Sequence, residues 1–102
     1  MKFKTYVTED AEADIRNASI WYDEQSPGLG DRFLRAYEYS KNSIQDNPYK
    51  CVQVKANVRR AILKRFPYCV FYVIHEAVQE VEIFAVVHAL SLIHISEPTR
   101  RI

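Results

Sequence analysis

The strongest constraint on the fold of this chain is a pair of helix-length segments separated by its only two glycines, Gly28 and Gly30. In the first segment the apolar residues recur at spacings of four, three and four, which places them on one helical face: Ala11, Ile15, Ala18 and Tyr22. The second segment has an equivalent stripe: Leu29, Phe33, Ala36, Tyr37 and Ile44. Pro27 and Gly28 break the helix between them. We therefore expect two antiparallel helices joined by a tight turn.

Local signals bound this helical pair at both ends. Thr8 suits a helix N-cap, and the acidic residues that follow it occupy the first turn, where the helix dipole favours negative charge. The second helix has to stop by Asn47, because Pro48 disfavours the α conformation in the residue before it. Both helices are therefore expected between Thr8 and Asn47.

The remaining segments either alternate between apolar and polar residues or are apolar throughout, and both patterns are typical of β-strands. We expect strands at residues 3–7, 58–66, 69–75 and 81–88, with residues 51–54 as a candidate extra edge strand. The predicted fold class is α+β in the order β-α-α-β-β-β, with the helical hairpin packed on one face of a mostly antiparallel four-stranded sheet. The apolar residues expected at the interface between helices and sheet include Ile15, Phe33, Leu63 and Phe71.

The length of 102 residues suits a single domain. The longest apolar run, residues 69–74, is far shorter than the roughly 18–20 residues that a membrane span requires. The N-terminal residues also lack the apolar stretch of a signal peptide. We therefore expect a cytoplasmic protein with no membrane partner.

The sequence offers little for a metal ion or a disulfide. Cys51 and Cys69 are too few and too far apart for a metal site or a disulfide framework, and a reducing cytosol would keep them as thiols. The three histidines, His75, His88 and His94, share no metal-ligand spacing. We expect neither a metal nor a cofactor.

The net charge of +1 conceals a division along the chain. Residues 9–46 carry nine acidic side chains against four basic ones. Residues 47–75 contain no acid and six basic side chains: Lys50, Lys55, Arg59, Arg60, Lys64 and Arg65. Such a basic segment is suited to contact with nucleic acid or with an acidic protein segment.

Three stretches of the chain form a recognisable pattern. They are residues 13–23, the Pro-Gly-Leu-Gly turn at residues 27–30 with Phe33 after it, and residues 57–72. The third is the most specific, because an Arg-Arg pair, an Arg-Phe-Pro-Tyr turn and an apolar strand rarely occur together in this order. In these stretches, and over residues 3–88 as a whole, the chain resembles toxins of the RelE/ParE superfamily from type II toxin-antitoxin, or plasmid stabilisation, systems.

The resemblance implies a small antitoxin as partner and two alternative targets. ParE-like toxins bind and inhibit DNA gyrase and are not hydrolases, whereas RelE-like toxins cut messenger RNA on the ribosome without a metal. A third alternative is an inactive module that binds an antitoxin only. We assign residues 1–89 to a RelE/ParE-like toxin domain. From Leu90 onward the family pattern is not continued, so residues 90–102 are expected to be a non-native or disordered tail.

Metal-free RNA cleavage needs a base, an acid and cationic groups that stabilise the transition state. The candidates for these roles are Arg60, Lys64, Tyr68 and His88. The candidates for binding a partner or nucleic acid are Lys55, Arg59, Arg60, Lys64 and Arg65. In a continuous strand Arg60 and Lys64 would point to one face and Arg59 and Arg65 to the other, so at most half of these cations can line one site.

The resemblance also weighs against the nuclease. RelE-like nucleases carry an essential Arg early in the strand after the turn, where this chain has Cys69. They carry a second Arg just past the last strand, where this chain reads Ala89-Leu90-Ser91. Tyr68 is most simply explained as a core aromatic residue, and Arg59 and Arg60 as a solvated edge or a contact with an acidic partner. His88 remains a candidate catalytic residue because family members often place a His at the end of this strand. The favoured function is ParE-like gyrase binding, with enzymatic activity left open.

The sequence makes one prediction about the tail. Residues 97–100 have neither an apolar period nor a strand pattern, so the segment after His88 is expected to contribute little to stability. Deleting residues 91–102 should leave the melting temperature nearly unchanged. A large drop would mean that Leu92, Ile93 and Ile95 dock on the sheet.

Overall fold

The computed structural model of the protein describes residues 3–90. Its elements are β1 (Lys4–Val7), α1 (Glu9–Gln25), α2 (Leu29–Asp46), β2 (Val52–Lys55), β3 (Val58–Ile62), β4 (Tyr68–His75), the short 3-10 turn η1 (Glu76–Val78) and β5 (Glu80–His88). The predicted α+β order is confirmed. The tail expected at residues 90–102 lies, apart from Leu90, outside the described residues.

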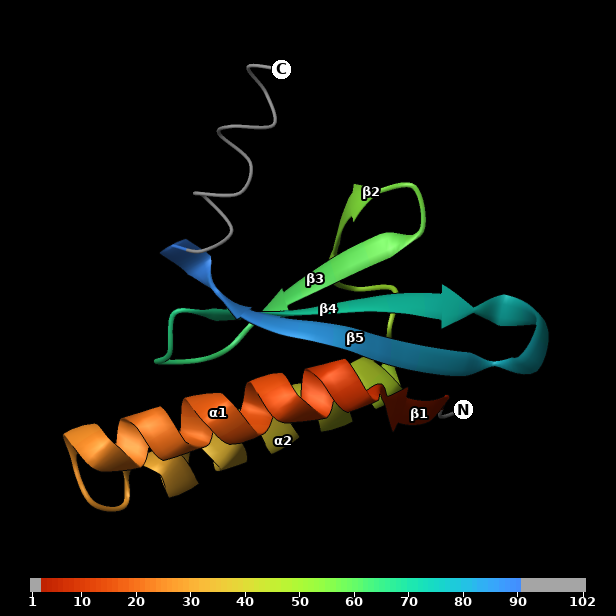
Figure 1. Ribbon diagram of the computed structural model, residues 1–102. Coiled ribbons are helices and arrows are strands. Elements are labelled where there is room, and N and C mark those ends of the chain that lie inside the picture. Colours follow the sequence, from red (N-terminus) through yellow and green to blue (C-terminus); the bar gives the residue numbers. More distant parts are fainter. Residues whose placement is uncertain (1–2, 91–102) are drawn as a thin grey trace.

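The sheet has five strands in the order β1-β5-β4-β3-β2. β1 pairs in parallel with β5, and the other neighbours are antiparallel. The count differs from the predicted four because β2, the candidate extra strand, pairs with β3 at the edge. Both helices lie below the sheet in Figure 1, so its upper face is left without either of them.

Capping and one close contact determine where the helices begin and how they pack. The Thr8 hydroxyl accepts a hydrogen bond from the Ala11 amide at 3.2 Å, which caps α1 as predicted. Gly28, with φ +89°, provides the left-handed residue between the helices. At Gly30 a Cβ would collide with the backbone oxygen of Ser19, so only glycine allows this close approach of α1 and α2.

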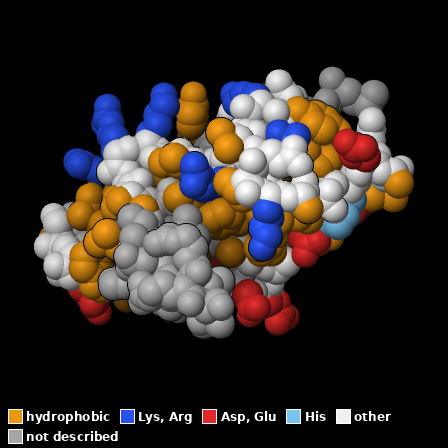
Figure 2. Space-filling model, turned by 90° about the horizontal axis from the view of Figure 1, so that it is seen from above, with side chains coloured by type: hydrophobic (Ala, Val, Ile, Leu, Met, Phe, Trp, Pro, Cys, Tyr) orange, Lys and Arg blue, Asp and Glu red, His pale blue; other side chains and the backbone are white. Residues whose placement is uncertain are grey.

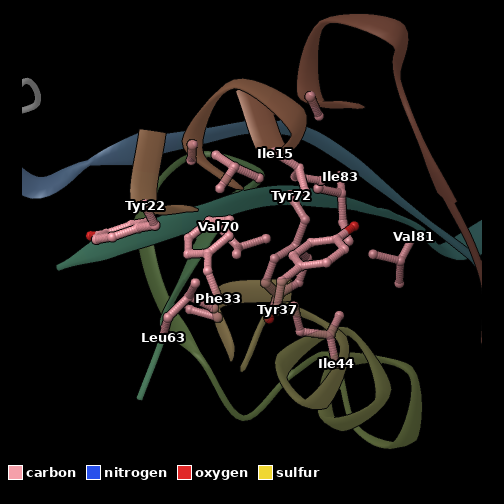
Figure 3. Packing of buried hydrophobic residues seen from close by; sticks show 14 residues of the cluster. Ile15, Tyr22, Phe33, Tyr37, Ile44, Leu63, Val70, Tyr72, Val81 and Ile83 are labelled. Carbon is pink, nitrogen blue, oxygen red and sulfur yellow. The ribbon is translucent and has the colours of Figure 1, made fainter. Parts of the chain in front are cut away.

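The core lies between the helices and the face of the sheet that is lower in Figure 1, and Figure 3 shows its side chains from close by. Phe33 and Ile44 from α2 are buried there with Val70, Tyr72 and Ile83 from the central strands. The predicted interface residues Ile15, Phe33 and Leu63 belong to this cluster.

Phe71, the fourth predicted interface residue, does not belong to this cluster. It lies on the upper face, where its ring centre is 6.5 Å from that of Phe84, and Tyr72 takes the position under the sheet. The run from Cys69 to Ile74 is apolar on both faces, so its pattern did not reveal which residues point toward the helices.

The strand predicted at residues 58–66 ends at Ile62. Arg65 has φ +69°, a left-handed conformation that a strand cannot contain. Two backbone hydrogen bonds close the turn, from the Leu63 amide to the Tyr68 oxygen at 3.0 Å and from the Tyr68 amide to the Phe66 oxygen at 2.8 Å. Residues 63–67 therefore form a tight connection between β3 and β4.

Replacing Phe33 tests the packing of the helices on the sheet. Phe33 is fully buried, so Phe33→Ala should lower the free energy of unfolding by about 3–5 kcal/mol. The change is measured by denaturant unfolding. The control Ile20→Ala alters an exposed residue of α1 and should cost no more than about 0.5 kcal/mol. A loss below about 1 kcal/mol for Phe33→Ala would show that this helix face is not in the core.

Candidate functional site

Tyr68 and His88 lie side by side at the end of the β4–β5 pair, where they are register partners. Their ring centres are 5.2 Å apart in an edge-on arrangement. With Asp14 and Trp21 of α1 they line a cavity of about 320 Å³. Burial, and to a lesser degree the Asp14 carboxylate, raises the pKa of the Tyr68 hydroxyl. At neutral pH this hydroxyl can donate a proton but is not a base.

The His88 ring is oriented by the backbone. Its Nδ1 accepts a hydrogen bond from the Leu90 amide at 3.0 Å. An acceptor nitrogen carries no proton, so in this arrangement Nε2 is the protonated nitrogen of the neutral ring. His88 therefore presents a donor at Nε2, and Tyr68 beside it is a donor as well.

Arg60 lies on the opposite face of the sheet from this pair. It is the register partner of Phe71 on the upper face, whereas Tyr68 packs under the sheet against aromatic residues of the helices. The buried Nε of Arg60 has no hydrogen-bond partner among the described residues. Burial raises the pKa of the neighbouring Cys69 thiol, and the Arg60 charge partly offsets this rise. Strand alternation thus separates Arg60 from His88 and Tyr68.

Arg59 is engaged in contacts within the protein. Its Nη1 donates to the backbone oxygens of Tyr49 at 3.0 Å and Cys51 at 2.8 Å. Its guanidinium carbon also lies 5.5 Å from the centre of the Tyr49 ring. Next to it, the hydroxyl of Tyr72, the register partner of Arg59, donates to the Pro48 oxygen at 2.7 Å. Together the two side chains fix the connection between α2 and β2.

Lys64 and Arg65 lie in the turn after β3, beside α2. The Lys64 ammonium is 5.1 Å from the centre of the Tyr39 ring. Both cations line a groove of about 650 Å³ between α2 and the turn, and Arg32 and Arg35 of α2 line it as well. The structure therefore brings together two of the predicted binding residues, Lys64 and Arg65, and two arginines from the acidic half of the sequence.

Arg32 and Arg35 were missed by the sequence analysis, which grouped them with the acids of residues 9–46. A signal for them was present, because residues three apart on a helix lie on the same side. Arg35 forms an exposed ion pair with Asp31 at 3.0 Å. The last predicted binding residue, Lys55, lies at the end of β2, where it is exposed.

The described residues contain neither a helix suited to span a membrane nor a cluster of metal-binding side chains. Neither α1 nor α2 is long and apolar enough to cross a membrane. Within residues 3–90, no group of three or more His, Cys, Asp and Glu side chains is placed to hold a metal ion.

The fold matches solved structures of toxins. A chromosomal ParDE toxin-antitoxin system from P. aeruginosa matches with a TM-score of 0.74 and 15% identity, over 85% of this chain and 96% of that chain. The E. coli RelBE toxin-antitoxin complex matches with a TM-score of 0.66 and 13% identity, over 85% and 96% of the two chains. A RelBE2 toxin-antitoxin complex from Mycobacterium tuberculosis matches with a TM-score of 0.59 and 18% identity, over 86% of this chain and 99% of that chain.

No protein-family model matches the sequence, and a search of curated proteins gives no match. At 13–18% identity, the structural likeness concerns the fold. The chain has the fold of RelE/ParE superfamily toxins, which confirms at this level the resemblance found in the sequence.

The contacts of Arg59 predict a structural role that can be tested. Arg59→Ala removes two charge-assisted hydrogen bonds and, because the site is partly exposed, should lower the free energy of unfolding by about 1–2 kcal/mol. The control Lys55→Ala removes an exposed cation on the neighbouring strand and should cost less than about 0.5 kcal/mol. Equal stability of the two variants in denaturant unfolding would contradict the structural role.

Proposed function

We propose that this chain is the toxin of a type II toxin-antitoxin system and that it is ParE-like: it binds and inhibits DNA gyrase in the cytoplasm and is neutralised by a cognate antitoxin. The likeness of fold to ParDE and RelBE toxins supports the general assignment. The choice of a binding mechanism rests on how the candidate catalytic residues are distributed.

The observation that carries this choice is that the four candidates lie at three separate places. Tyr68 and His88 are under the sheet, Arg60 is on the upper face, and Lys64 contacts the Tyr39 ring beside α2. Metal-free cleavage requires a base, an acid and a cation around one phosphate. A protein that acts by binding needs no such convergence, so this distribution favours binding.

A RelE-like ribonuclease is the second candidate function, and the contact between Tyr68 and His88 favours it. The two ring centres are 5.2 Å apart, and both residues line the same cavity. The positions at which the resemblance implies cationic residues hold Cys69 and Ala89 instead. The inactive antitoxin-binding module is the remaining alternative.

Among the basic residues expected to bind a partner, Lys55, Lys64 and Arg65 are exposed and available for contact. Arg60 is half-buried, and Arg59 is occupied by backbone oxygens. We assign partner contact to the exposed residues first, since a solvent-facing cation can pair with an acidic group without breaking an internal interaction.

Two assays run on the same purified protein test this function. The wild type should inhibit DNA supercoiling by gyrase and leave ribosome-associated messenger RNA intact, and the antitoxin should restore supercoiling. Cleavage of ribosome-bound messenger RNA, abolished by His88→Ala and with gyrase unaffected, would identify the ribonuclease instead. Antitoxin binding with neither activity would identify the inactive module.

A further inference from the structure

The groove between α2 and the turn at residues 63–67 combines a basic rim with apolar walls. Its volume of about 650 Å³ lies within the range of roughly 300–1,000 Å³ that is typical of binding pockets. The rim carries four cations: Arg32, Arg35, Lys64 and Arg65. Leu29, Ala36, Phe66 and Pro67 contribute apolar surface between them. In Figure 2 blue basic side chains gather at the upper left of the molecule, with orange apolar side chains close by.

The groove is held in shape by the core beneath it. The Phe66 ring is 5.0 Å from the Tyr22 ring and 5.4 Å from the Phe33 ring, both edge-on. The backbone of the turn is closed by hydrogen bonds on both sides of Phe66. Because its walls are already ordered, a partner that binds here loses little free energy to rearrangement of the groove.

The charge on the rim is poorly balanced within the described chain. Arg35 pairs with Asp31, but the two side chains are 76% and 66% exposed, so the pair is weak and open to competition. The side chains of Arg32 and Arg65 make no hydrogen bond or ion pair with the described residues. A carboxylate from another molecule can therefore approach either guanidinium and accept two parallel hydrogen bonds.

We propose that this groove docks an acidic segment of a partner protein, with one large apolar side chain seated against Phe66 and Ala36 and with carboxylates paired to Arg32 and Arg65. The inference rests on the proposed function, since the partner it specifies is the antitoxin. It adds the position of the contact and the chemistry of the segment.

A protein segment fits the groove better than single-stranded nucleic acid does. Nucleic-acid grooves stack successive bases on exposed aromatic faces. Tyr22 is buried and already packed against Phe33 and Phe66. Tyr39 is 61% exposed, but the Lys64 ammonium lies over its ring. An apolar side chain needs no open ring face, so the groove suits a mixed acidic and apolar segment.

Charge reversal at the rim tests the inference. The partner used is the purified protein encoded by the reading frame adjacent to this gene, and its binding is measured by surface plasmon resonance at low and at physiological salt. Arg32→Glu/Arg65→Glu should weaken binding by about tenfold or more, chiefly through a slower association with a smaller salt dependence. The control Arg16→Glu/Lys41→Glu makes the same charge change beside a different cleft and should alter affinity less than about twofold.

A second variant tests the groove without changing its charge. Ala36→Trp should fill the apolar space and also weaken binding, while circular dichroism confirms that every variant is folded. If the partner binds the wild type and both groove variants equally, the docking site is wrong and the proposed function stands. If the groove variants lose only the binding of a single-stranded oligouridine, the site is for nucleic acid and the inference is overturned. If the wild type neither binds the partner nor inhibits gyrase, both proposals fail.

Discussion

The contact on which the rest of this structure depends is the aromatic cluster formed by Tyr22, Phe33, Phe66 and Tyr68. One ring comes from each helix and two come from the chain around the turn between β3 and β4, with ring centres 5.0–6.0 Å apart. Edge-on and stacked rings at these distances stabilise beyond the burial of their area. The cluster joins the helical hairpin to the turn, and so it determines which surface residues of the two become neighbours.

The larger features of this arrangement could be predicted from local patterns. The stripe of apolar residues in each helix, the cap at Thr8 and the break at Pro27 are signals carried by residues close in sequence, and the structure has both helices where these signals indicate. The prediction that was wrong, the orientation of Phe71, depends on tertiary context. Phe71 and Tyr72 are both apolar members of a fully apolar strand, and only the packed structure decides which of them faces the helices.

The basic segment at residues 47–75 also shows that the sequence pattern alone did not predict which side chains share a surface. The six basic residues from Lys50 to Arg65 follow one another with no acidic residue between them, but they do not form one surface. Arg59 is directed to backbone oxygens, Arg60 lies on the upper face, and the turn carries Lys64 and Arg65 to α2. Arg65 adopts a left-handed backbone conformation although it is not a glycine, and the sequence pattern did not predict this.

The placement of the basic residues on different surfaces affects which side chains can act together in this chain. The fold supplies a sheet with one face packed on helices and the other free of them, and catalysis on it requires that acid, base and cation project from one face. Here alternation along β3 and β4 puts Arg60 above the sheet and Tyr68 below it. A one-residue shift of either strand would bring the two to one face. In β3 it would also move Ala61 out of the core, and in β4 it would move Val70 and Tyr72 out. The packing that stabilises the protein is therefore what keeps Arg60 and Tyr68 on opposite faces of the sheet.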